Sequence, residues 1–262
     1  MKPKTLIVVP CFNEASRLDG QAFLDFLGPY PHIHVLFVND GSTDTTRQVL
    51  ENFVKARPEQ MSLLNLPKNS GKAEAVRQGF LKGFLSFPVD LIGYFDADLA
   101  TPLSTIIELE GLFSNPSFEI AMGSRVKLLG RNIERDSRRH YIGRIFATLA
   151  SMTLGLAVYD TQCGAKLFKV TERLKKVFSF SFTVTWIFDV EILARFMIME
   201  RCHPTGRAVS KICVEYPVRE WIDKKGSKVK FWHYLTSTKD LLKILFRVKF
   251  SPQNHPYCQK LL

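Results

Sequence analysis

The stretch Asp90-Leu91-Ile92-Gly93-Tyr94-Phe95-Asp96-Ala97-Asp98 decides the fold, because a run of strand-forming residues ends in two carboxylates. The apolar part predicts a buried β-strand over 90–96. In open α/β sheets, ligands bind beyond the carboxyl ends of the strands. Asp96 and Asp98 would therefore face a ligand. Two carboxylates so close together favour a hard cation, Mg²⁺ or Mn²⁺, that is shared with phosphates.

A purely structural interpretation of the same residues is also open. In it, Asp98 caps the helix that begins near Thr101-Pro102, where proline is well tolerated in the first turn. For an isolated Asp-X-Asp this interpretation is the more common one. The rest of the chain favours the ligand site.

Working outward, apolar runs alternate with helical patterns. Strands are expected at 5–9, 34–38, 61–66, 90–96 and 119–123. A helical pattern follows each of the first three strands. This alternation predicts an α/β fold with a mostly parallel sheet and helices on both faces.

Polar side chains follow these strands at the same end. Glu14 comes after the first and Asp40 after the second, so both should meet Asp96 and Asp98 at one rim. Neither Gly-x-Gly-x-x-Gly nor a Walker loop occurs in the sequence, which disfavours a dinucleotide or P-loop enzyme. The rim instead offers carboxylates that hold a base, a ribose and a metal-bridged diphosphate.

Four motifs along this half carry a family resemblance: Pro10 to Glu14, Asn39 to Asp44, Asn69 with Gly71-Lys72, and Asp96-Ala97-Asp98. Together they resemble the family 2 glycosyltransferases of GT-A (Rossmann-like) fold. The resemblance implies that a nucleotide sugar is the donor. It implies a donor site made of Pro10, Phe12, Glu14, Asp40, Lys72, Asp96, Ala97 and Lys228, with Asp96 and Asp98 as metal ligands.

Motifs in the second half resemble the polyprenol-phosphate branch, in particular its glucosyltransferases. They are Gly123-Ser124-Arg125, 160–168, 188–191 and 226–228. Ala100 also fits the glucosyl type, since the mannosyl type usually has Gln there. The resemblance implies inverting transfer of a hexose, above all glucose, from a UDP-sugar to a polyprenyl or dolichyl phosphate. GDP-mannose or another donor, and a soluble or different lipid acceptor, stay open.

A phosphate acceptor sets the demands on the site. A phosphate monoester is largely a dianion at neutral pH and needs no catalytic base, but positive charge must bring it beside the donor. Arg125 ends the fifth predicted strand and is expected to bind this phosphate. By alignment with the family Arg139 is its second ligand, with Arg138 and Arg144 as the open alternatives.

The expected catalytic residues are Asp98, Arg125, Asp160 and Asp189. Asp160 would orient a sugar hydroxyl or an acceptor-binding arginine, unless it only forms a turn before a strand. Asp189 and Glu191 cannot share one helical face, so we expect Asp189 at the sugar and Glu191 paired with a buried arginine.

The segment 223–230 is expected to form a loop over the bound substrates. Its Gly-Ser-Lys sequence matches the family at Ser227, expected at the acceptor, and at Lys228, expected at the diphosphate. An exposed basic loop is the structural alternative.

We expect one GT-A domain over 1–230, with a nucleotide-sugar half (1–125) and an acceptor half (126–230), followed by an amphipathic basic helical tail over 231–262. The basic segment 125–144 precedes an apolar run at 145–159. A helix there either meets lipid, with Ile145, Phe146, Leu149, Met152 and Leu156 against the tails, or packs on the core with a solvated basic end.

Charge and cysteine content concern partners and location. The net charge of +11 in 262 residues predicts an anionic partner, and its clustering beside an apolar run favours an anionic membrane surface over nucleic acid. Five scattered cysteines predict reduced thiols. Without a signal peptide or an apolar run of ~18 residues, the chain is expected to be cytoplasmic and peripheral on the cytoplasmic face of a membrane.

Overall fold

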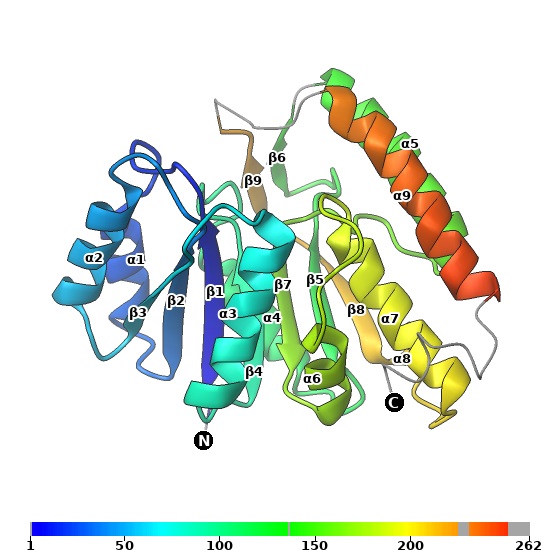
Figure 1. Cartoon of the computed structure of the whole chain (residues 1–262), viewed down its shortest axis with the longest axis horizontal. Helices are drawn as coiled ribbons and strands as arrows, with labels where there is room; N and C mark the ends of the chain where they lie inside the picture. The colour runs from blue at the N-terminus through cyan, green and yellow to red at the C-terminus, as the bar shows by residue number, and fades with distance from the viewer. Residues whose placement is uncertain (1, 136, 225–230, 251–262) are drawn as a thin grey trace.

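The structure of the protein is a computed structural model, which describes residues 2–135, 137–224 and 231–250. Its centre is a seven-stranded sheet with the strand order β3-β2-β1-β4-β7-β5-β8 (Figure 1). A separate pair, β6 (Asn132–Glu134) and β9 (Glu220–Ile222), lies near one end of the sheet. This arrangement confirms the predicted α/β class.

Strands and helices alternate through the first half of the chain as predicted. The elements are β1 (Thr5–Cys11), α1 (Gly20–Leu27), β2 (Ile33–Asn39), α2 (Thr46–Ala56), β3 (Met61–Asn65), α3 (Lys72–Ser86), β4 (Leu91–Phe95), α4 (Thr105–Leu112) and β5 (Ile120–Ser124). Strands β1, β2, β3 and β4 pair in parallel. Their carboxyl ends therefore meet at one edge of the sheet.

The second half of the chain adds two strands to the central sheet, β7 and β8, that were not predicted from the sequence. Its elements are α5 (Ser137–Leu154), β7 (Ala165–Lys169), α6 (Glu172–Phe178), α7 (Phe188–Cys202), α8 (Val209–Ile212), β8 (Cys213–Pro217) and α9 (Phe231–Phe250). Strand β7 runs antiparallel between β4 and β5. Gly93 permits this pairing, because a Cβ there would lie 2.2 Å from the Lys166 carbonyl oxygen.

The two faces of the sheet carry separate apolar cores. Alternate side chains of β1 show the division: Leu6 and Val8 join one core, and Ile7 and Val9 join the other. Helices α3, α6, α7 and the inner sides of α5 and α9 cover the first face, whereas α1, α2 and α4 cover the second. Burial on both faces explains why the strands are continuous apolar runs.

Helices α5 and α9 pack side by side at the edge of the molecule (Figure 1). Their inner sides join the core through Ala150 of α5 and Ile244 of α9. Their outer sides carry apolar residues that remain exposed, namely Tyr141, Ile145, Leu149 and Met152 of α5, and Leu242 and Phe246 of α9. We call these six residues the apolar face. The core-packing interpretation of α5 is confirmed for its inner side, and Phe146 and Leu156, which were expected at lipid, also pack against the core. Contact of the outer side with lipid stays a prediction.

Two further expectations can be compared with the structure. Over the ranges described, no helix combines the length and the hydropathy that crossing a bilayer requires. Cys11, Cys163 and Cys213 are free thiols, as predicted, whereas Cys202 is in a disulfide and the prediction is wrong there. Scattering along a sequence does not restrict which thiols meet in the fold. Cys258 lies outside the described residues.

Candidate active site

A pocket of about 420 Å³ lies at the carboxyl edge of the sheet. It is lined by all the predicted site residues that the structure describes with side chains: Pro10, Phe12, Glu14, Asp40, Lys72, Asp96, Ala97, Asp98, Arg125, Asp160 and Asp189. Helix α5 contributes Arg144 and Ala147, and α9 contributes Ser237. The side chain of Arg139, and Ser227 and Lys228 altogether, lie outside what the structure describes.

Asp40 fixes the loop that leads into α3. Its two carboxylate oxygens accept hydrogen bonds from the backbone N–H groups of Ser70 and Gly71, each at 2.8 Å. Gly41 follows with φ +62°, and a Cβ there would lie 2.4 Å from the backbone of Lys68. Only glycine fits both conditions. The Asn39–Asp44 motif is therefore a rigid part of the pocket edge.

Arg17 links two of the predicted carboxylates at this edge, those of Glu14 and Asp98. Its guanidinium lies 2.9 Å from Asp98 and 3.4 Å from Glu14. The Glu14 backbone N–H donates to the Thr46 hydroxyl at 2.8 Å, which ties β1 to α2. Arg17 was not predicted as a site residue, and its only signal in the sequence is its position three residues after Glu14.

Asp96 and Asp98 form an acidic pair whose charges are unfavourable together. Burial raises the pKa of Asp98, and the neighbouring charge of Asp96 raises it further. Lys72 Nζ lies 2.5 Å from Asp96 Oδ1. Burial acts to lower the pKa of Lys72, but the charges of Asp96 and Asp189 outweigh it and raise this pKa.

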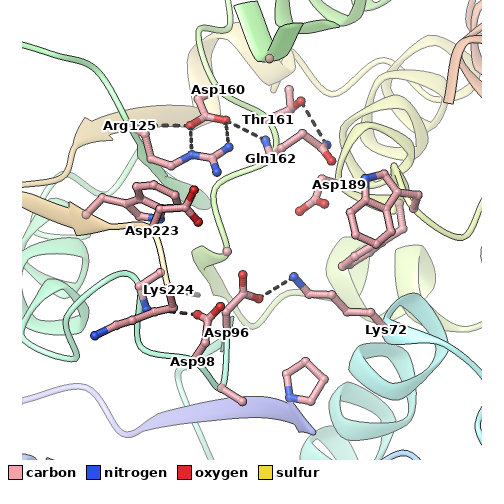
Figure 2. Close-up of a pocket in the computed structure, with 18 of the residues that line it drawn as sticks. Lys72, Asp96, Asp98, Arg125, Asp160, Thr161, Gln162, Asp189, Asp223 and Lys224 are labelled. Atoms are coloured by element: carbon pink, nitrogen blue, oxygen red, sulfur yellow. Dashed lines mark hydrogen bonds and ion pairs between the residues drawn. The ribbon is translucent and has the colours of Figure 1, made fainter. Parts of the chain in front are cut away.

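The chemistry of this pair fits a hard divalent cation. Such ions take carboxylate oxygens, hold few protein ligands and complete their shell with phosphates and water. Among the residues described there is no group of three or more metal-binding side chains. Figure 2 shows Asp96 and Asp98 together on one side of the pocket, with Lys72 reaching Asp96.

Arg125 and Asp160 form a second charged pair on another side of the pocket (Figure 2). Arg125 Nε and Nη2 donate to the two Asp160 oxygens at 2.6 and 2.8 Å. Burial alone would raise the pKa of Asp160, but the Arg125 charge and hydrogen bonds hold it far below its usual range. Asp160 thus pairs with an arginine, as one of its two predicted roles requires, and the binding of the acceptor by this arginine stays a prediction. The Arg125 guanidinium also lies 5.3 Å from the centre of the Trp221 ring.

Glu215 of β8 supports Asp160 from behind. Its carboxylate accepts the backbone N–H groups of Tyr159 and Asp160 at 2.7 and 2.8 Å. The sequence analysis did not assign Glu215. A charged residue in the middle of the β-rich stretch 213–217 is the signal that could have found it.

Asp189 is held by donors from the sheet. Lys166 Nζ donates to Asp189 Oδ1 at 2.7 Å and to the Cys163 carbonyl at 2.6 Å, and the Tyr94 hydroxyl donates to the same Asp189 oxygen. Lys166 and Tyr94 are both buried. Burial, followed by the charge of Asp189, raises the pKa of Tyr94 well above its ordinary value. The tyrosine therefore stays neutral and donates a hydrogen bond to the carboxylate.

Glu191, two residues further along α7, points elsewhere. Its carboxylate lies 2.9 Å from Arg195 Nη2, and both side chains are almost fully buried. The predicted pairing of Glu191 with a buried arginine is confirmed.

Residues 6–174 match the family model described as Glycosyl transferase family 2. The chain belongs to this family. Its similarity to curated relatives extends beyond the matched region. It is 32% identical over 253 residues to dolichyl-phosphate beta-glucosyltransferase ALG5C of Trichomonas vaginalis, covering 92% of this chain and 70% of that protein. It is 31% identical to the human dolichyl-phosphate beta-glucosyltransferase over 259 residues, covering 92% and 74%.

Solved glycosyltransferase structures share the fold. Glucosyl-3-phosphoglycerate synthase of Mycobacterium tuberculosis, in complex with Mn²⁺, UDP and glucosyl-3-phosphoglycerate, has a TM-score of 0.62 at 16% identity, over 94% of this chain and 80% of that one. The Pyrobaculum calidifontis mannosyltransferase PcManGT, in complex with GDP-Man and Mn²⁺, has a TM-score of 0.61 at 15% identity, over 99% and 69%. This family 2 glycosyltransferase therefore has the GT-A fold.

Proposed function

We propose that this family 2 glycosyltransferase transfers glucose from UDP-glucose to a polyprenyl phosphate such as dolichyl phosphate. The observation that carries the proposal is that one pocket holds two distinct sites suited to anions. Asp96 and Asp98 with Lys72 suit a metal-bound diphosphate, and the Arg125–Asp160 pair presents a fixed guanidinium to a second phosphate. The similarity to dolichyl-phosphate beta-glucosyltransferases supports glucose as the transferred sugar and dolichyl phosphate as the acceptor.

On the donor side, Asp96 and Asp98 would hold Mg²⁺ or Mn²⁺. Such an ion, when bound, offsets the negative charge that develops on the leaving diphosphate. Lys72 adds a positive charge beside Asp96. Glu14 and Asp40, with Pro10, Phe12 and Ala97 around them, form the end of the pocket proposed for the nucleoside.

On the acceptor side, Arg125 binds the phosphate and Asp160 fixes the guanidinium in place. An acceptor phosphate oxygen supplies the electron pair for the new bond to the anomeric carbon. The bond from that carbon to the UDP oxygen breaks, and its electron pair leaves with the diphosphate. A β-glucoside formed from an α-linked donor requires inversion, which a single displacement of this kind gives. Arg139 and Ser227 at the acceptor, and Lys228 at the diphosphate, remain predictions.

Asp189 is proposed to accept a hydrogen bond from a hydroxyl of the transferred sugar. Replacing Tyr94 by phenylalanine removes one of its two side-chain donors and keeps the aromatic packing against Phe168 and Phe188. We expect the KM for UDP-glucose to rise about fivefold while the Kd for UDP stays the same, because UDP lacks the sugar. Steady-state kinetics and titration calorimetry measure the two constants. A change in thermal stability alone would mean that the hydroxyl supports only the core.

The acceptor lipid would approach along helices α5 and α9. Their inner sides line the pocket through Arg144, Ala147 and Ser237, and their outer sides form the apolar face. An exposed apolar patch on a strongly basic protein suits an anionic bilayer, whose headgroups attract the charge and whose tails take the apolar residues. We propose that the protein sits peripherally on the cytoplasmic face of a membrane.

The test uses UDP-glucose with a radiolabelled sugar, dolichyl phosphate in detergent, and Mn²⁺. We expect the label to move into the organic phase, and the transfer to stop when EDTA removes the metal. GDP-mannose and a water-soluble phosphate acceptor are run in parallel. Label that reaches the lipid only from GDP-mannose would overturn the donor, and label that stays in water would overturn the acceptor. A thermal-shift panel of nucleotide sugars with and without Mn²⁺ reports binding separately.

A further inference from the structure

The segment 179–187 between α6 and α7 forms a wall of the pocket without regular secondary structure. Thr185 and Trp186 line the pocket, and Asp189 follows in the first turn of α7. A segment of this kind has backbone N–H and C=O groups that no helix or sheet satisfies. The position of Trp186 therefore depends on which side chains hold the backbone around it.

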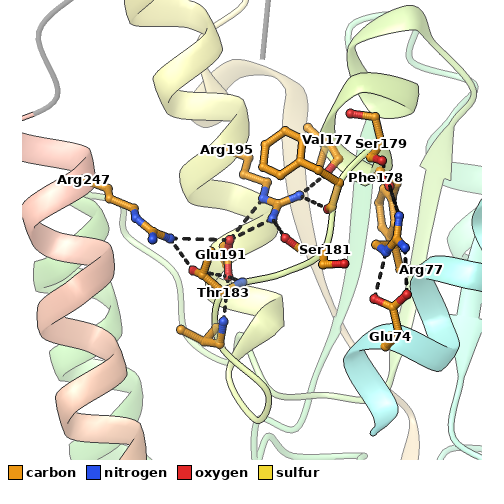
Figure 3. A network of polar contacts seen from close by, with 12 residues as sticks. Glu74, Arg77, Val177, Phe178, Ser179, Ser181, Thr183, Glu191, Arg195 and Arg247 are labelled. Carbon is orange, nitrogen blue, oxygen red and sulfur yellow. Dashed lines mark hydrogen bonds and ion pairs between the residues drawn. The ribbon is translucent and has the colours of Figure 1, made fainter. Parts of the chain in front are cut away.

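Two arginines hold carbonyl groups of this wall and of the last turn of α6 that precedes it, as Figure 3 shows. Arg195 of α7 donates to the carbonyl oxygens of Val177 at 2.5 Å, Phe180 at 2.9 Å and Ser181 at 2.7 Å. Its guanidinium also stacks on the rings of Phe180 and Phe182. Arg77 of α3 donates to the carbonyls of Phe178 and Ser179 at 3.4 and 3.3 Å.

Glu191 holds the N–H groups of the same wall. One oxygen, Oε2, accepts from the backbone N–H of Thr183 at 2.8 Å and of Val184 at 3.1 Å. The other, Oε1, accepts from Arg195 Nη2 at 2.9 Å. Glu191 and Arg195, both on α7, thus hold the wall together: Glu191 binds its backbone N–H groups and Arg195 binds its backbone carbonyl groups.

Arg247 brings helix α9 into this network (Figure 3). Its Nη1 donates to the Thr183 hydroxyl and lies 3.8 Å from Glu191 Oε1. The preceding residue, Phe246, belongs to the apolar face and is 62% exposed. One short stretch of α9 therefore carries both an outward apolar side chain and an inward contact to the pocket wall.

We propose that Arg247 is a positioning residue that fastens α9 to the wall 179–187, so that the seating of α9 sets where Trp186 lies in the pocket. The nucleoside end is built on β1, β2 and β4, outside this network. Removing the Arg247 contact should therefore reduce the rate of sugar transfer to the acceptor but leave the binding of UDP unchanged. This inference rests on the proposed function only for the identity of the substrates.

Hydrogen exchange measured by mass spectrometry tests the link without any substrate. In Arg247→Ala we expect the peptide that contains Thr183 and Val184 to exchange about tenfold faster than in the wild type. Lys243→Ala is the matched control: it removes one positive charge a helical turn earlier on α9, where Lys243 pairs within the helix with Asp240. Exchange in that variant should equal the wild type. Unchanged exchange in Arg247→Ala, or equal acceleration in both variants, would overturn the proposal.

Kinetics supply the second measurement. Arg247→Ala should bind UDP with Mn²⁺ within about twofold of the wild-type Kd and lose about tenfold in kcat/KM for transfer. Arg247→Lys keeps the positive charge on a shorter side chain and should recover part of the lost kcat/KM. A parallel loss of UDP affinity would point to general destabilisation and contradict a positioning role. If the wild type transfers no sugar to the lipid, the proposed function fails, while the exchange experiment still decides the role of Arg247.

Discussion

Gly164→Ala is expected to reduce kcat/KM for transfer by about two orders of magnitude and to abolish the Mn²⁺-dependent thermal shift with UDP. A Cβ at Gly164 would lie 2.0 Å from Asp96 Oδ2 and 2.2 Å from its Cγ. The Asp96 backbone N–H also donates to the Gly164 carbonyl at 3.0 Å, so the two residues cannot simply move apart. The carboxylate must turn away from its place beside Asp98 and Lys72.

Gly111→Ala is the matched control, because it is the same chemical change at an exposed site of α4 where a Cβ meets nothing within 4 Å. In a helix this change should leave activity unaltered and raise stability slightly. Circular dichroism would check that both variants are folded. Wild-type metal dependence in a folded Gly164→Ala protein would mean that the Asp96 carboxylate is not a donor-site ligand.

The Arg125–Asp160 pair gives the second large effect. Asp160→Asn leaves a buried guanidinium without its counter-charge, and we expect a loss of about 3 kcal/mol in the free energy of unfolding. Transfer should fall at least about a hundredfold, because the guanidinium loses its fixed orientation. Urea denaturation and acceptor kinetics measure the two effects separately.

A double variant separates stability from activity at this pair. Replacing both charges, as in Arg125→Met with Asp160→Leu, removes the uncompensated charge and should recover most of the lost stability. Transfer should stay at least about a hundredfold below the wild type, because the proposed acceptor phosphate loses the Arg125 guanidinium. Recovery of transfer together with stability would show that the pair has only a structural role.

The difference in stability between the wild type and the double variant has a defined pH dependence. The pKa of Asp160 is lowered in the folded protein, so its ionised form favours folding at every pH above its unfolded pKa of about 4. This contribution is lost as the pH falls from there through the folded pKa. The stability of the wild type relative to the double variant should therefore shrink progressively below about pH 4.

The first half of the chain was predictable from sequence for a simple reason. Strands buried on both faces are continuous apolar runs, and in a parallel sheet the residue after each run lies at the same edge. Glu14, Asp40 and Asp96 could thus be placed together although they are far apart in the chain. The residues that support Asp160 and Asp189 could not. Lys166 binds Asp189 of α7, and Glu215 binds the backbone of Tyr159 and Asp160, in each case far away in the sequence. A charge inside the stretch 213–217 marks Glu215 as unusual, but it does not say which groups Glu215 contacts.

Helices α5 and α9 show a different limit of prediction from the sequence. An apolar stripe in a sequence does not say whether protein or another phase covers it, so both interpretations of 145–159 stayed open. In the structure the stripe divides: Ala150 and Leu154 enter the core, and Ile145 and Met152 remain exposed. The positions of α9 and α7 beside α5 decide which residues of the stripe are covered and which remain exposed.

Strand β7 has a consequence for how the chain reaches its native state. Because β7 lies between β4 and β5, the central sheet cannot close until residue 169 has left the ribosome, and its last strand must await residue 217. A fragment ending at Ser124 would present the bare edge of β4 to other chains, and such edges invite aggregation. The segments before and after Ser124 therefore cannot fold independently, one after the other. Pairing between strands so far apart in the sequence also makes folding slow.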